Sequence, residues 1–173
     1  MTACTHLITA AESGAAPITP LSESDLHEWL RPQTKTLRRW VDTLRFTAKP
    51  GSVCLIPGTD GGLERVLVGR GERADIWTWA ALPASLPEAD YRLDESLEVN
   101  DPATSIDPDA VALGWTLGTY RFSRYRAHEG GFARLVWPAG SDRDAVERAA
   151  DATFLVRDLI NTPAADIDRK SVV

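Results

Sequence analysis

The segment from Ser141 to Asp166, SDRDAVERAADATFLVRDLINTPAAD, constrains the fold most. It contains a long helical pattern followed by a proline at which the helix must end. Ser141 is placed to cap the first turn, and acidic residues follow it where the helix dipole favours negative charge. Pro163 has no N–H and disfavours helical geometry at Thr162, so we expect the helix to end near Asn161. Apolar or small residues recur at the spacing of a buried helical face: Val146, Ala149, Ala150, Thr153, Val156 and Ile160.

Ahead of this helix, helical and strand-like patterns alternate, which is typical of an α/β layered domain. Ser22 and Asp25 have the spacing of a capping box, and Asp75 and Asp107 (or Asp109) are placed to cap later helices. Helical patterns cover 22–30, 33–44, 75–82 and 109–124, with Pro83 and Pro87 ending the third; strand-like runs cover 6–9, 17–21, 53–57, 63–69, 91–93 and 132–137. The sequence therefore predicts a layered mixed sheet flanked by helices. Its expected core includes Trp40, Trp115, Phe122, Trp137 and Phe154.

Two glycines mark the helix predicted over 109–124. Gly114 and Gly118 lie on its apolar face, although each costs about 1 kcal/mol of helix propensity relative to alanine. Such a cost, met twice on one face, favours close packing, and we expect this helix to lie against the sheet.

Composition sets limits on the partners. The 173 residues carry a formal net charge of −6, which argues against nucleic acid or an acidic membrane surface as the main partner. Residues 1–20 lack the basic start and apolar run of a signal peptide, and no apolar run is long enough to span a membrane. Cys4 and Cys54 have no metal-type spacing and are expected to be free thiols in a reducing cytoplasm. We expect residues 1–16 to form a loose N-terminus.

Two stretches resemble binding motifs. The GTDGG run, Gly58 to Gly62, has glycines that could present backbone N–H groups to a phosphate, but it lies between two strand-like runs, which favours a hairpin turn. The run TYRFSRYR interleaves three aromatic residues with Arg121, Arg124 and Arg126, a mixture that could stack bases and hold phosphates. The alternative is that Phe122 and Tyr125 continue a buried face while the arginines reach solvent or pair with carboxylates.

No residue set has the pattern of a metal site. His6, His27 and His128 are too scattered to form a ligand set. Asp101, Asp107 and Asp109 flank prolines and are expected to serve as turn and cap residues.

Four stretches together resemble a known family: RDLINTPAAD, LGWTLGTYRFSRYR (113–126), ARLVWP (133–138) and AKPGSVCLIPGTDGG (48–62). They are similar to the N-terminal domain of leucyl aminopeptidases, the cytosol aminopeptidase family, over most of residues 17–167. The resemblance implies a sheet covered by helices, similar to a macro domain, as a non-catalytic domain over 17–160. It also implies that 161–167 begins the linker to a metallopeptidase domain.

The family's chemistry is expected outside this chain. The resemblance implies a cytoplasmic hexamer, built mainly through its catalytic halves, that releases N-terminal amino acids from peptides with two divalent ions, Mn or Zn. A lysine, several aspartates and a glutamate hold these ions, the last within a motif of the form NTDAEGR, which this sequence does not contain. Lys35, Lys49 and Lys170 lie outside that context. We therefore assign no catalytic, cofactor-binding or metal-binding residue, and expect an inactive chain that is a monomer or a weak oligomer.

The tail departs from the family, in which Met-Gly-Pro follows INTPAxD. Residues Asp168 to Val173 back-translate to GATCGGAAGAGCGTCGTG, a common sequencing-library adapter, so we expect 168–173 to be an artefact; the alternative is a natural variant tail.

Two other functions stay open at this point. One is a stand-alone macro-like module that binds a nucleotide or ADP-ribose, and the other is a structural interaction domain without a ligand.

Overall fold

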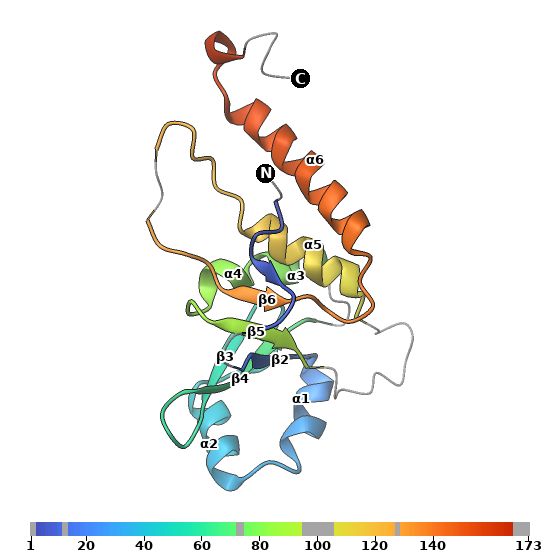
Figure 1. Ribbon diagram of the computed structural model, residues 1–173. Helices are drawn as coiled ribbons and strands as arrows, with labels where there is room; N and C mark the ends of the chain where they lie inside the picture. The colour runs from blue at the N-terminus through green and yellow to red at the C-terminus, as the bar shows by residue number, and fades with distance from the viewer. Residues whose placement is uncertain (1–2, 12–13, 72–74, 95–105, 127–128, 168–173) are drawn as a thin grey trace.

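A six-stranded mixed sheet forms the centre of the computed structural model, which describes residues 3–11, 14–71, 75–94, 106–126 and 129–167 (Figure 1). Its strand order is β1-β6-β5-β2-β4-β3, and every neighbouring pair is parallel except the antiparallel pair β3 and β4. The predicted mixed α/β sheet flanked by helices is confirmed. The strands are β1 (Leu7–Ile8), β2 (Ala16–Leu21), β3 (Val53–Pro57), β4 (Leu63–Gly69), β5 (Asp90–Leu93) and β6 (Arg134–Val136).

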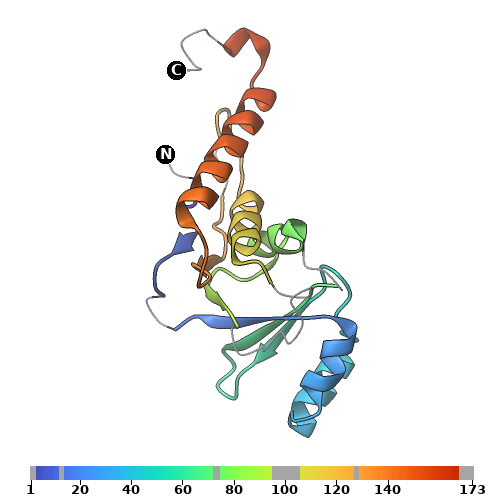
Figure 2. The same cartoon turned by 90° about the vertical axis from the view of Figure 1, so that its right-hand side faces the viewer.

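Helices cover the two faces of the sheet unequally. α1 and α2 lie on one face, whereas α3 to α6 lie on the other, and α6 extends well away from the sheet (Figures 1 and 2). Each face has its own core, one around Leu21, Val41 and Leu67, the other around Tyr91 and Trp115. The helices are α1 (Glu23–Leu30), α2 (Lys35–Thr43), α3 (Ile76–Ala80), α4 (Leu82–Ser85), α5 (Pro108–Gly118) and α6 (Arg143–Asn161), followed by the 3-10 turn η2 (Ala164–Asp166).

Local capping residues start most of these helices where the sequence predicts. Ser22 and Asp25 form a full capping box at α1, with the Ser22 N–H donating to Asp25 Oδ2 at 3.0 Å. Burial alone would raise the pKa of the Asp25 carboxyl, but hydrogen bonds from Ser22 and Arg70 outweigh it and hold that pKa below its usual value. Asp75 caps α3 and Asp107 caps α5.

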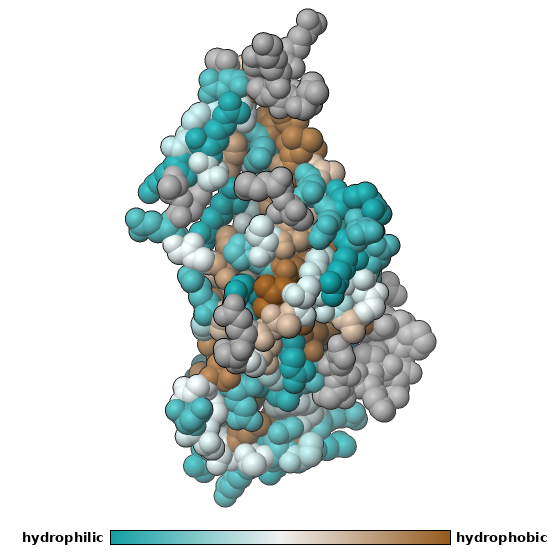
Figure 3. Space-filling view, viewed as in Figure 1, coloured by the Kyte–Doolittle hydropathy of each residue, from teal (hydrophilic) through white to brown (hydrophobic). Residues whose placement is uncertain are grey.

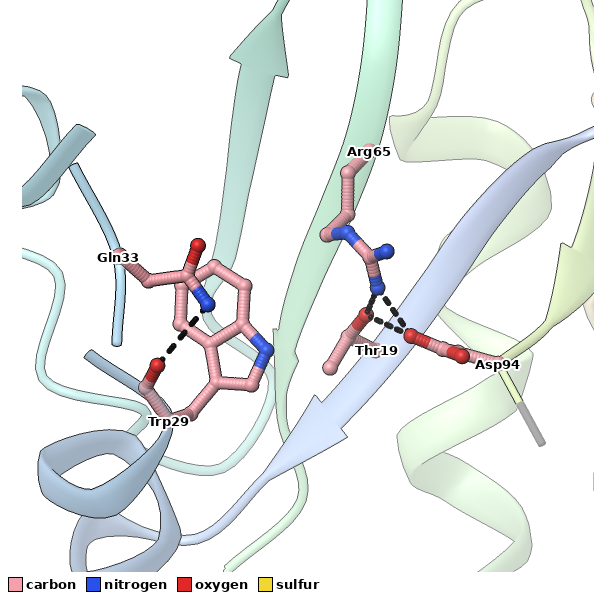
Figure 4. Close-up of polar contacts among 5 residues, drawn as sticks. All are labelled: Thr19, Trp29, Gln33, Arg65 and Asp94. Carbon is pink, nitrogen blue, oxygen red and sulfur yellow. Dashed lines mark hydrogen bonds and ion pairs between the residues drawn. The ribbon is translucent and has the colours of Figure 1, made fainter. Parts of the chain in front are cut away.

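The far end of α1 has a cap that the sequence analysis did not foresee. Gln33 Nε2 donates to the Trp29 carbonyl at 3.1 Å, which satisfies one of the free carbonyls of the last turn (Figure 4).

Two helix boundaries differ from the prediction. Asp142, not Ser141, caps α6, because its side chain accepts from Ala145 N at 3.0 Å while the Ser141 hydroxyl donates to the Pro138 carbonyl. The helix ends at Asn161, as predicted. Pro83 does not end the third helix; it lies in the first turn of α4, where a missing N–H costs nothing.

The two glycines of α5 do allow a close approach, but to α3 and not to the sheet. A Cβ on Gly118 would lie 2.0 Å from the Ala80 carbonyl oxygen, and one on Gly114 would lie 2.4 Å from that of Ile76. α5 also ends at Gly118, six residues before the predicted end at 124, where the Thr119 N–H and hydroxyl both donate to the Thr116 carbonyl and cap the helix.

The predicted core is partly wrong. Trp115 is fully buried, and Trp137 and Phe154 pack against the same core while keeping some exposure; Phe122 is partly buried. Trp40 is exposed. Helical periodicity placed it on one face with Val41, but in the structure Val41 is the residue of α2 that is buried, whereas Trp40 lies at the edge of the sheet beside Leu55.

The N-terminal segment is better ordered than expected. β1 pairs with β6, which confirms the predicted strand near 6–9, and Ala3, Cys4 and Leu7 are buried in the core. The expectation of a loose N-terminus is therefore wrong for residues 3–11. The predicted loop over 100–105, Asp101, His128, Lys170 and the tail 168–173 lie outside the described residues.

Candidate functional site

The segment after α5 holds the second half of α6 by polar contacts. Tyr120 Oη donates to Asp158 at 2.8 Å and accepts from Asn161 Nδ2 at 3.1 Å, while its ring packs edge-on against Phe154. Arg157 lies over the Tyr120 ring and donates to the Leu117 carbonyl at 3.0 Å. The end of α5 and the end of α6 are thereby fixed to each other.

The same segment also reaches the chain beyond α6. Tyr125 Oη hydrogen-bonds to the Asp166 carboxylate, and Arg124 donates to the Asp166 carbonyl at 3.2 Å. Both ends of the run Tyr120 to Tyr125 therefore hold α6 and η2, and we call this run the clamp segment. It fixes the direction in which the chain leaves the sheet domain (Figure 2).

The arginines of this run agree in part with the second expectation, because Arg124 and Arg126 reach solvent, but Arg121 and Arg124 also donate to backbone carbonyls. Arg121 donates to the carbonyls of Glu129 and Gly130 and lies 3.9 Å above the centre of the Phe132 ring. Arg124 also donates to a carbonyl, and Arg126 is exposed. Tyr125 is exposed as well, so the predicted continuation of the buried face is wrong beyond Phe122.

A groove of about 760 Å³ lies between the clamp segment, the start of the chain and α6. His6 lines it, with its ring edge-on to Phe132 at 5.3 Å. Burial, then the nearby charges of Arg121 and Arg134, lower the pKa of His6 below its usual value. Phe154, Leu155 and Asp158 of α6 form the opposite wall.

Beyond this groove, α6 presents apolar side chains to solvent. Val156 is 53% exposed and Ile160 is 76% exposed, and Leu155 lies beside them. Figure 3 shows this apolar surface over the upper part of the helix. The predicted buried face is therefore correct for Val146 and Ala150 and wrong for the last two positions of the pattern.

An ionic cluster on β2, β4 and the end of β5 was missed by the sequence analysis (Figure 4). Thr19 Oγ1 donates to Asp94 Oδ2 at 2.8 Å, and Arg65 forms an ion pair with the same carboxylate. Asp94 is buried, so this cluster ties three parallel strands together from within. No local pattern signals it, because the three residues come from separate strands.

The other candidate residues stay apart. The GTDGG run joins β3 to β4, which are antiparallel, so the hairpin reading is confirmed and no helix follows it. His6 lies beside β1 and His27 is exposed on α1. Within the described ranges, no group of three or more His, Cys, Asp or Glu residues could hold a metal ion. The described residues therefore do not fit the family's two-metal site.

Within those same ranges, no helix combines the length and apolarity needed to cross a bilayer.

Comparison with known proteins identifies the domain. Residues 16–138 match the M17 aminopeptidase N-terminal domain. The chain belongs to this family. Probable cytosol aminopeptidases of two Mycobacterium strains, KMS and JLS, are 29% identical to it over 112 residues, which is 58% of this chain and 22% of theirs. The resemblance to the N-terminal domain of leucyl aminopeptidases is confirmed.

Solved structures agree with this M17 assignment. The crystal structure of the cytosol aminopeptidase from Coxiella burnetii superposes with a TM-score of 0.78 at 31% identity, over 94% of this chain and 34% of that one. The bottromycin maturation enzyme BotP in complex with Mn has a TM-score of 0.57 at 29% identity, over 90% of this chain and 33% of its own. The M17 chain described here thus spans between 22% and 34% of the length of these relatives.

Proposed function

We propose that this chain is the non-catalytic N-terminal domain of a metal-dependent leucyl aminopeptidase. The observation that carries the proposal is the second half of α6, where Leu155, Val156 and Ile160 face solvent on a helix that the clamp segment contacts through Tyr120. Exposed apolar patches on soluble domains mark interaction surfaces. The metallopeptidase half of the enzyme is the partner that this surface fits, since α6 leads directly out of the domain.

The whole enzyme would release N-terminal amino acids from peptides in the cytoplasm, using two divalent ions, Mn or Zn, held by its catalytic half. It would assemble as a homo-hexamer through those halves, whereas this chain alone would be a monomer. The present domain would contribute a docking surface and shape the assembly. It would bind neither nucleic acid nor membrane.

The first test is catalytic. The purified 173-residue chain is expected to show no turnover of leucine p-nitroanilide with added manganese, with the Coxiella burnetii cytosol aminopeptidase assayed in parallel as the comparison. Turnover by the chain itself would overturn its non-catalytic role.

The second test addresses docking. Residues 1–166 are grafted in place of the N-terminal domain of the Coxiella burnetii enzyme, and thermal stability and turnover of the chimaera are measured. The double variant L155D/V156D is expected to lower the chimaera's melting temperature and its turnover, because it charges the apolar contact. L44D, a change of the same kind at the half-exposed leucine that follows the last residue of α2, is the control and should change neither. Equal effects of the two variants would reject α6 as the docking surface.

A further inference from the structure

β3 forms one edge of the sheet, so one side of its backbone faces no other strand of the part of the chain that the structure describes. The Gly69 N–H donates to the Ser52 carbonyl at 2.8 Å, which places Ser52 among the residues that face β4. Because strand residues alternate in direction, Val53 and Leu55 turn their backbone groups outward. An edge of this kind is a template for another strand.

The side chain of Trp40 covers the middle of that edge. Its indole Nε1–H, from α2, donates to the outward carbonyl of Leu55 at 3.0 Å. Trp40 is 41% exposed and Leu55 is 37% exposed, and Leu44 lies one helical turn after Trp40 with half of its surface in solvent. The side chain thus occupies the acceptor that an incoming strand would use first.

The edge is complementary to itself. The strand VCLIP carries no charge, so two copies of the strand laid antiparallel would place no like charges opposite each other. Centred on Leu55, such a pair would join the two Leu55 residues by reciprocal hydrogen bonds. The Val53 N–H of each copy would then face the Pro57 carbonyl of the other, an acceptor that a proline retains. The missing N–H of Pro57 costs this pair one bond on each side and no more.

We propose that the β3 edge is a strand-pairing surface for a second copy of this chain, and that the Trp40 indole closes it in the monomer. The few exposed apolar side chains at this edge are too small an area to hold a stable dimer by themselves. Backbone pairing must supply the rest, and it requires the Leu55 carbonyl to be released. This surface is separate from α6 and does not depend on the domain's role in an aminopeptidase.

The test measures self-association of the full chain by sedimentation equilibrium. W40F keeps an aromatic ring but has no N–H donor, and W40A removes the cover altogether. Both are expected to raise the dimerisation constant, W40A by at least tenfold over the unmodified chain. W77F and W77A, which change an exposed tryptophan on α3 across the sheet, are the matched controls and should leave the constant unchanged.

Amide hydrogen exchange locates the contact. In W40A, hydrogen exchange at the Val53 and Leu55 amides should become slower as the protein concentration is raised, because strand pairing protects the outward N–H groups. Adding L55P to W40A should restore the monomer while keeping the fold, since an outward edge position tolerates proline. Folding of every variant is checked by circular dichroism. If W40F and W40A associate no more than the unmodified chain, or if W40A/L55P associates as strongly as W40A, the proposal is wrong.

Discussion

The two halves of α6 are held in different ways, although one helical pattern runs through both. In the first half, Val146 and Ala150 are buried in the core, so apolar burial fixes the helix. In the second half, Val156 and Ile160 face solvent, and the helix is held by Tyr120 through Asp158 and Asn161. The contrast shows that apolar periodicity identifies the face of a helix that is suited to packing. It does not show whether that face packs inside the domain or is left exposed on its surface.

The strongest test of this difference between the two halves of α6 places the same charged side chain in each half. V146D would bury an unpaired carboxylate and is expected to lower the free energy of unfolding by about 3–5 kcal/mol. V156D changes an exposed residue and should shift it by no more than about 0.5 kcal/mol. Urea unfolding of both variants gives the two values. Similar costs at the two sites would contradict the division of α6 into a buried and an exposed half.

A smaller effect is expected from removing the polar contacts. Y120F loses its hydrogen bonds with Asp158 and Asn161 and is expected to cost about 0.5–1.5 kcal/mol. Hydrogen exchange should quicken in the last turns of α6 and remain slow around Val146. Y125F, which loses only the contact with Asp166, is the control expected to quicken exchange near η2 alone. Uniform exchange along the helix in Y120F would show that the clamp segment does not hold it.

The smallest effect concerns the groove beside the second half of α6. Burial, together with Arg121 and Arg134, lowers the pKa of His6, so the unfolded chain binds a proton more readily than the folded one. Stability from this group is therefore present above the unfolded pKa of about 6.5 and is lost as pH falls toward the folded value. Between pH 7.5 and pH 5, the unmodified chain should lose more stability than H6Q. H27Q, at an exposed position, should follow the unmodified chain; identical pH profiles for H6Q and the unmodified chain would refute the assignment.

Local chemistry made part of this fold predictable. Ser22, Asp75 and Asp107 are recognisable caps because each satisfies backbone groups within three residues, and the GTDGG hairpin needs only its own turn. Gly114 indicated that another segment packs closely against α5, but the local sequence does not say which one. In the structure that segment is α3.

The rest depends on contacts between distant segments. The Thr19–Arg65–Asp94 cluster joins three strands whose order no local pattern gives. Trp40 has the position of a core residue on its helix, yet it lies at the surface, where its indole donates to the Leu55 carbonyl. Apolar spacing alone predicted that α5 would continue to residue 124, whereas the helix ends at Gly118 and Tyr120 contacts α6.

The pairing of β1 with β6 has a consequence for synthesis. Leu7 leaves the ribosome early, but its partner Leu135 is among the last residues of the sheet to be made. Until then β1 has no strand to join, and Ala3 and Cys4 cannot reach the core that they finally enter. The first strand translated is thus among the last to join the sheet. The nascent sheet lacks this edge strand until synthesis has passed β6 and is about to begin α6.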